Sequence, residues 1–239
     1  MVIPTTGIVF LFGAFVYIYL ARRFWNCYKL ENNNTAKLFS YAFLSFGLGY
    51  FIQGAVSLLL IESQSVWRII SPLFGVCMAG GYGIITYAAA RIKFQESLLF
   101  VKTLFPLILI LICIPGIIFF ILSPPIYFYT DGTLNWEIKS EVAPLIFGVS
   151  SLFIVFSATV FFREAKKIQD KKGKIRAFGL GLALLWLIVA MVTDFFLLTI
   201  LKVHPIFSDL NYSIMFLILA ITLILTWSPP RPKWVKKIE

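Results

Sequence analysis

The chain has 239 residues and a formal net charge of +10, and 60% of its residues are hydrophobic whereas only 13% are charged. A water-soluble domain cannot bury that much apolar surface. No polar stretch is long enough to form a soluble domain beside the apolar segments. The composition therefore excludes the soluble classes and predicts a single membrane domain over residues 1–239.

Apolar runs of about 20 residues are long enough for a helix to cross roughly 30 Å of hydrocarbon. The sequence contains seven such runs, and they are continuously apolar, whereas a transmembrane β-strand alternates with period two. We therefore predict an all-α fold, an integral membrane seven-helix bundle, in which Arg22 and Arg23 close the first span. The predicted helices cover about residues 7–25, 38–61, 67–91, 98–122, 144–166, 177–201 and 205–227, followed by a basic tail over residues 228–239.

The distribution of lysine and arginine predicts the orientation. With seven spans, alternate connections lie on the same side, and one side collects 17 of the 21 basic residues. Basic residues close to the end of a span resist translocation, so this side is predicted to be cytoplasmic. The chain is then a multi-pass protein of the cell membrane, with its N-terminus outside and its C-terminus in the cytoplasm.

The positive charge also bears on partners. It lies in short loops beside the membrane, where it fixes topology and meets anionic lipid head groups, so the lipid bilayer is the predicted partner and nucleic acid is not. The connection between the fifth and sixth predicted helices is rich in lysine and is a candidate docking surface for a cytoplasmic signalling protein. The candidate docking residues are Lys166, Lys167, Lys171, Lys172 and Lys174.

The segment between the fourth and fifth predicted helices, about residues 123–142, is the one substantial outer connection. Aromatic and β-branched residues flank Asp131 and Gly132, a dipeptide favoured in two-residue hairpin turns because both positions need a positive φ. We therefore predict a short outer β-hairpin between helices 4 and 5. It either covers helix ends or acts as a lid over an outward-facing cavity.

Polar side chains inside the apolar runs are the clearest functional signal, because a charge in hydrocarbon is costly and tends to face the bundle interior. Asp194, beside Thr193, and Gln53 are predicted to lie at comparable depths below the outer surface. Asp209, Asn211 and Tyr212 lie near the start of the seventh helix. We predict that these residues line an outward-facing pocket for a small molecule. The alternative is plain hydrogen bonding between helices, worth about 0.6 kcal/mol per bond.

Catalytic chemistry is poorly supported. One histidine and three scattered cysteines form no metal or haem ligand set, so no cofactor, no metal and no enzymatic activity are predicted. Ser150 and Ser151 could act as nucleophiles only if His204 reached them from the outer rim. A retinal protein needs a lysine in the last span, and residues 205–227 contain none.

The layout resembles the seven-helix N-terminal sensor module of some prokaryotic histidine kinases and cyclic-nucleotide enzymes. The resemblance rests on Ala21-Arg22-Arg23 at the end of the first helix, the hairpin-like insertion before the fifth, and the stretch Pro205–Leu210 at the start of the seventh. It implies a sensor or receptor-like module that binds a small molecule outside and affects a partner inside. The sequence departs from that pattern because no effector domain follows residues 228–239, so we expect the signal to pass to a separate protein.

Two other functions stay open. The chain could be a non-catalytic accessory subunit of a larger membrane protein complex, with other membrane subunits as partners. It could also be a small-solute transporter, which would favour helices broken near the midplane. Pro115 and Gly116 are the only well-placed break in the sequence.

Overall fold

The computed structural model describes residues 5–59, 64–94, 126–128, 133–136, 143–193 and 204–226, together with residues 103, 107, 110, 111, 198 and 201. Within these residues, six helices are long enough and apolar enough to cross a membrane. They are α1 (Thr5–Glu31), α2 (Asn34–Leu59), α3 (Gln64–Lys93), α5 (Ala143–Lys167), α6 (Lys171–Val192) and α7 (Ile206–Thr226). The prediction of a helical, multi-pass membrane protein is confirmed at this level.

The predicted helix over residues 98–122 lies almost wholly outside the described residues, as does the candidate break at Pro115 and Gly116. Residues 103, 107, 110 and 111 are described, and all four are helical. A seventh span therefore stays a prediction.

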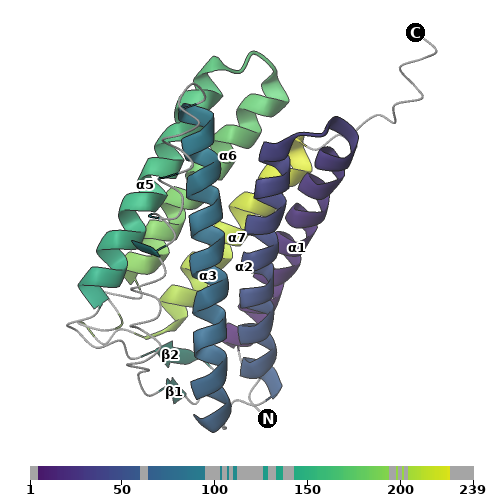
Figure 1. Ribbon diagram of the computed structural model, residues 1–239. Helices are drawn as coiled ribbons and strands as arrows, with labels where there is room; N and C mark the ends of the chain where they lie inside the picture. The colour runs from purple at the N-terminus through teal and green to yellow at the C-terminus, as the bar shows by residue number, and fades with distance from the viewer. Residues whose placement is uncertain are drawn as a thin grey trace.

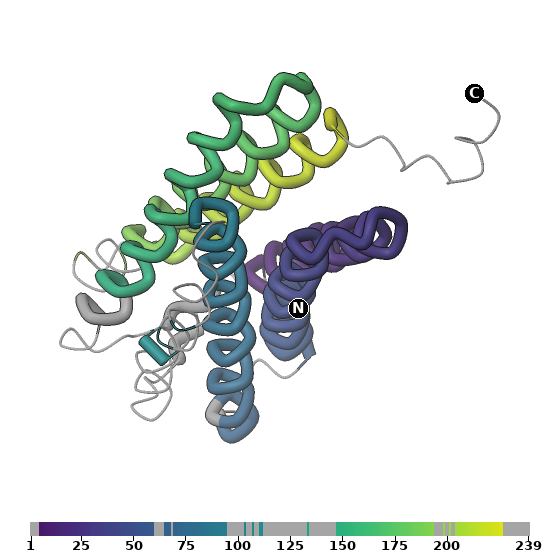
Figure 2. The backbone as a smooth tube through the Cα atoms, turned by 45° about the horizontal axis from the view of Figure 1, so that its top comes forward, coloured from purple at the N-terminus to yellow at the C-terminus, as the bar shows by residue number. Residues whose placement is uncertain are grey.

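The six described helices close a ring, because each packs against the next in the order α1, α2, α3, α5, α6, α7, and α7 packs against α1. In Figure 1, α3 stands between the α1–α2 pair and the α5–α6 pair, and α7 runs obliquely behind it. Figure 2 shows the same arrangement seen more nearly along the helices. Buried aromatic and aliphatic side chains from all six helices fill the centre.

The two ends of this ring differ in charge. At the upper end in Figure 1, α1, α3 and α5 end and α2 and α6 begin. We call this the basic end, since it carries Lys29, Lys37, Arg91, Lys93 and the lysines between residues 166 and 174. At the opposite end α1, α3, α5 and α7 begin and the two short strands lie, so we call it the hairpin end.

The first helix is longer than predicted. α1 continues to Glu31, because arginine is a good helix former and Arg22 and Arg23 leave the backbone hydrogen bonds of the helix intact. The turn to α2 is made by asparagines: Asn32 has a positive φ of 52°, and the Asn33 side chain accepts hydrogen bonds from two amides of the first turn of α2.

The sixth helix begins earlier than predicted, at Lys171 rather than near residue 177. Asp170 caps it, since its carboxylate accepts a hydrogen bond of 2.7 Å from the Gly173 amide. The Lys-rich segment between residues 171 and 176 is therefore a helical extension of the span, not a loop.

β1 (Ile126–Phe128) and β2 (Leu134–Trp136) form an antiparallel pair in which Tyr127 lies opposite Asn135. This is the pairing that the predicted outer hairpin requires. The predicted turn at Asp131 and Gly132 lies outside the described residues.

Burial within the bundle matches a lipid solvent. Phe15, Leu152 and Ile224 are 70%, 73% and 79% exposed, and they belong to many large apolar side chains on the outer faces of the helices, as a lipid-facing surface requires. Hydroxyl groups inside the bundle donate to backbone carbonyls of a neighbouring helix. Ser40 of α2 donates to the Ala21 carbonyl of α1, and Ser45 of α2 donates to the Cys77 carbonyl of α3.

Glycines allow the closest helix contacts. A Cβ added to Gly54 of α2 would lie 2.9 Å from the Leu11 amide nitrogen and 3.1 Å from the Gly7 carbonyl oxygen of α1. Both neighbours are backbone atoms, which cannot rotate away. The α1–α2 contact therefore depends on the absence of a side chain at residue 54.

We expect Gly54→Ala to lower the free energy of unfolding by about 1–3 kcal/mol, because α1 and α2 must separate to admit the methyl group. Gly148→Ala is the matched control, since an added Cβ there meets nothing within 4 Å. Thermal unfolding in detergent compares the two variants. Equal stability of both would contradict the close contact.

Candidate functional site

Three aromatic rings from three helices meet on the hairpin side of the bundle centre. The ring centroid of Phe10 in α1 lies 5.6 Å from that of Tyr50 in α2 and 5.8 Å from that of Tyr212 in α7. Tyr50 and Tyr212 lie 6.4 Å apart, edge to face. Such pairs add about 0.5–1.5 kcal/mol beyond burial. This aromatic trio defines a level at which α1, α2 and α7 face one another.

Each ring of the aromatic trio has a polar neighbour one helical turn closer to the hairpin end. These neighbours are Thr6, Gln53 and Asp209, at spacings of four, three and three residues. Residues three or four apart share a helix face, so the three side chains belong to one layer. Thr6 Oγ1 donates to Asp209 Oδ2 at 2.7 Å and joins α1 to α7. All three residues are buried, and we call them the polar layer.

Gln53 carries an unmet hydrogen-bonding capacity in this layer. It is 1% exposed, and its Oε1 accepts no hydrogen bond in the described part of the chain. A buried acceptor left unsatisfied costs about 1–3 kcal/mol. Ser151 Oγ and Trp186 Nε1 are likewise buried without a partner among the described residues. A serine hydroxyl can rotate to its own helix backbone, and the Trp186 side chain as a whole is less deeply buried than that of Gln53.

A second polar contact joins the end of α6 to α7. Asn211 Nδ2 donates to Thr193 Oγ1 at 2.9 Å and to the Phe207 carbonyl at 3.0 Å. Thr193 is buried and π-helical, directly after α6. Single π-helical turns occur often at functional sites, because they displace the helix face locally. The widened turn therefore lies where α6 meets the polar end of α7.

The structure places five of the predicted ligand-binding residues toward the hairpin end. Gln53 and Asp209 share the polar layer, Thr193 and Asn211 form the contact with α6, and Tyr212 belongs to the aromatic trio. Asp194, predicted as the central residue, lies outside the described residues.

The predicted docking lysines lie at the opposite, basic end, around the turn between α5 and α6. Lys166, Lys167, Lys171, Lys172 and Lys174 are all exposed. Lys167 pairs with Glu164 at 2.7 Å, an exposed ion pair worth little in stability. The structure thus separates the two groups of predicted site residues by the length of the bundle.

Sequence reasoning does not single out Thr6. A threonine at the start of an apolar run is common, and its partner Asp209 lies 203 positions away. The position of each residue within its helix could have revealed the pair. Thr6 and Asp209 both lie in the first turn of a helix that begins at the hairpin end, so they lie at a similar height in the bundle. An acidic side chain in the first turn of α7 is favoured by the helix dipole.

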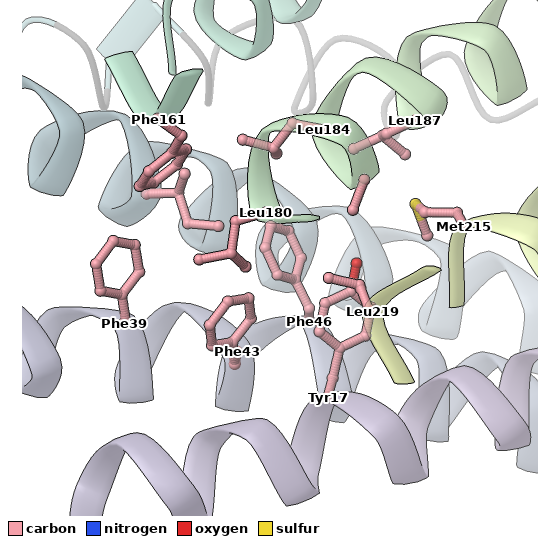
Figure 3. Close-up of a pocket in the computed structure, with 12 residues that line it drawn as sticks. Tyr17, Phe39, Phe43, Phe46, Phe161, Leu180, Leu184, Leu187, Met215 and Leu219 are labelled. Carbon is pink, nitrogen blue, oxygen red and sulfur yellow. The ribbon is translucent and has the colours of Figure 1, made fainter. Parts of the chain in front are cut away.

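Tyr17 connects the aromatic trio to a narrow cavity in the centre of the ring. Its ring stacks on that of Tyr50 at 5.6 Å with an interplanar angle of 3°, and on that of Phe43 at 5.9 Å. Figure 3 shows Tyr17 on one side of the cavity, with Leu184 and Leu187 of α6 on the other. The volume is about 20 Å³, counted as space open to the centre of a water-sized sphere. That is little more than one water needs, so the cavity is too small for a metabolite.

The polar layer offers a hydrogen-bond acceptor, the amide oxygen of Gln53. An acceptor suits a ligand that donates from an ammonium or hydroxyl group. Within the described residues, no three His, Cys, Asp or Glu side chains come together as a metal site.

Comparison with protein-family models, curated proteins and solved structures finds no match. The functional argument therefore rests on the geometry of this chain alone.

We expect Thr6→Val to weaken the attachment of α1 to α7, because valine keeps the shape of threonine but cannot donate to Asp209. In a double-mutant cycle with Asp209→Ala, the coupling free energy should be about 0.6 kcal/mol and at most about 1.7 kcal/mol, as for hydrogen bonds between membrane helices. Chemical or thermal unfolding in detergent provides the four stabilities.

Thr159→Val is the matched control. Thr159 is exposed on α5 and donates only to its own helix, to the Val155 carbonyl at 2.8 Å. It should change stability by no more than about 0.5 kcal/mol. A coupling of zero between residues 6 and 209 would show that the bond contributes nothing to the fold.

Proposed function

We propose that the protein is a receptor-like sensor of the cell membrane that binds a small hydrogen-bond donor at the polar layer. Gln53 is the observation that carries the proposal. A glutamine at this depth is costly unless its oxygen gains a partner, and leucine or methionine would fill the same space without that cost. A ligand that donates to Gln53 Oε1 removes the penalty.

The proposed orientation puts the hairpin end outside and the basic end in the cytoplasm. The separation of charge between the ends supports it, since basic residues flank the cytoplasmic ends of spans. In this orientation the polar layer lies toward the outer face of the membrane. The exposed lysines of the α5–α6 turn then face a cytoplasmic signalling partner, as the prokaryotic sensor modules suggest.

The aromatic row supports coupling between the two ends. Tyr212, Tyr50, Tyr17 and Phe43 are in ring contact one after another, from the polar layer to the central cavity. A ligand that moves α7 relative to α1 and α2 displaces these rings, and the cavity gives neighbouring side chains room to repack. Signalling requires only that the ligand bind with different affinity to the two arrangements of α7, before and after it moves relative to α1 and α2.

An accessory subunit of a larger membrane complex is the second proposal. Exposed apolar residues along the outer face of α3, such as Ile69, Leu73 and Val76, would pack against another subunit as readily as against lipid. That function needs no ligand. Stoichiometric co-purification of a membrane partner in mild detergent, with no ligand response, favours it over the receptor.

Orientation can be tested by cysteine labelling in a variant whose native cysteines are replaced. His204→Cys at the hairpin end and Lys171→Cys at the basic end are both exposed positions. A membrane-impermeant maleimide should label residue 204 in intact cells and residue 171 only after lysis. The reverse pattern would overturn the orientation, and labelling of both in intact cells would overturn the membrane topology.

Ligand binding can be tested by thermal unfolding of the purified protein with a panel of small primary amines and polyols. We expect at least one member to raise Tm, because only the folded state binds it. Gln53→Met keeps the length of the side chain but removes the acceptor, and should weaken binding about fivefold, as expected for a hydrogen bond worth about 1 kcal/mol.

Gln169→Met is the control, because Gln169 is exposed in the α5–α6 turn. It should leave the response unchanged. A panel without effect, or a response that survives in Gln53→Met, would argue against the polar layer as the ligand site.

A further inference from the structure

The turn between α1 and α2 carries an unusual group of rings and cations on its outer surface. Trp25 lies 5.3 Å from Tyr28, ring centre to ring centre, and 6.0 Å from Tyr41 of α2. Lys29 Nζ lies 5.8 Å from the centre of the Trp25 ring. Lys37 Nζ lies 5.2 Å from the centre of the Tyr28 ring and 5.9 Å from that of Tyr41. We call these five residues the aromatic–lysine collar.

Within the described residues, the two lysines contact aromatic rings and not carboxylates. A cation over an aromatic face is attracted by the ring quadrupole and keeps its charge available to a third group. Within the described residues, the ion pair present is that of Lys167 with Glu164, and neither collar lysine takes part in one. Arg22, exposed one turn before Trp25, adds a further positive charge, and Glu31 is the acidic residue of this turn.

An apolar strip continues from the collar toward the hairpin end. On α2, Leu44, Leu48 and Phe51 follow Tyr41 on the same helix face, and the four residues are between 42% and 48% exposed. From Tyr41 to Phe51 the helix rises about 15 Å, which is half the thickness of the hydrocarbon core. The strip therefore has the length of one lipid acyl chain.

We propose that the collar and the strip form a binding site for an anionic phospholipid. Lys29 and Lys37 contact the phosphodiester. The indole N–H of Trp25 and the hydroxyls of Tyr28 and Tyr41 lie at the level of the head group, where aromatic residues are favoured. One acyl chain lies along Leu44, Leu48 and Phe51. A zwitterionic lipid is disfavoured, because its own ammonium group would approach the two lysines.

This site is independent of the proposed receptor function, because it uses neither the polar layer nor a signalling partner. It lies on the outer surface of the bundle at the basic end, whereas the polar layer lies inside at the hairpin end. A variant that abolishes lipid binding at the collar therefore leaves ligand binding at the polar layer testable, and the reverse also holds.

The test uses the full chain, delipidated in a neutral detergent, and measures Tm with dioleoyl phosphatidylglycerol, with dioleoyl phosphatidylcholine, and with inorganic phosphate. We expect phosphatidylglycerol to raise Tm by about 3 °C or more beyond phosphatidylcholine, as ligand binding to the folded state requires. Phosphate alone should have no effect, since it cannot contact the apolar strip. Equal shifts with the two lipids would overturn the proposal.

The variant Lys29→Gln/Lys37→Gln should lose more than half of the difference between the two lipids, whereas Lys29→Arg/Lys37→Arg should retain it. Lys166→Gln/Lys171→Gln is the matched control. It also removes two positive charges, from exposed positions at the basic end that do not belong to the collar. Equal loss in both glutamine pairs would show a general charge effect and refute a site at the collar.

Tyr41→Leu separates the rings from the charges. It keeps an apolar side chain at an exposed position, so folding without lipid should be unaffected. We expect it to reduce the preference for phosphatidylglycerol, because Lys37 loses one of the two rings that position it. An unchanged preference would show that the rings do not organise the lysines.

Discussion

The attachment of α7 to α1 and α2 through Phe216 is the contact on which the candidate site depends. Phe216 is fully buried, and its ring meets those of Tyr50 at 5.1 Å and Tyr17 at 5.9 Å, edge to face. It rests directly on Gly13 of α1, where an added Cβ would lie 2.3 Å from the ring. This contact sets the register of α7 against α1, and so places Asp209, two turns along α7, beside Thr6.

The spans could be predicted from the sequence because lipid imposes one strict rule: a segment that crosses hydrocarbon must be apolar and must satisfy its backbone internally. Hydropathy reports the membrane-buried length, however, and not the helix length. Arg22 and Arg23 end the apolar run, yet the helix continues to Glu31. The helix ends at the asparagines. Asn32 adopts a positive φ, and the Asn33 side chain caps α2; a hydropathy profile contains neither signal.

The site could be predicted only in part. Gln53 and Asp209 stand out in the sequence because they interrupt apolar runs, and depth alone places both near the same membrane surface. Their assembly into a layer with Thr6 depends on the relative rotation and height of three helices. Those quantities follow from side-chain packing, such as Phe216 against Gly13, which no spacing pattern within one helix contains. The same limit applies to the aromatic–lysine collar, where Trp25 and Tyr41 belong to different helices.

Polar groups within the bundle satisfy their hydrogen bonds in two ways, and Gln53 differs from both. At hydrocarbon depth, most hydroxyl groups described here bond either to a carbonyl of their own helix, as Thr222 does to Ile218, or to a neighbouring helix, as Ser40 does to Ala21. Such bonds cost little, because each donor finds an acceptor that already exists. Within the described residues, the Oε1 atom of Gln53 follows neither route, although the side chain is 1% exposed. A buried acceptor without a partner among the described residues, in a layer whose other members are bonded across helices, is the arrangement expected where a ligand completes the hydrogen bonding.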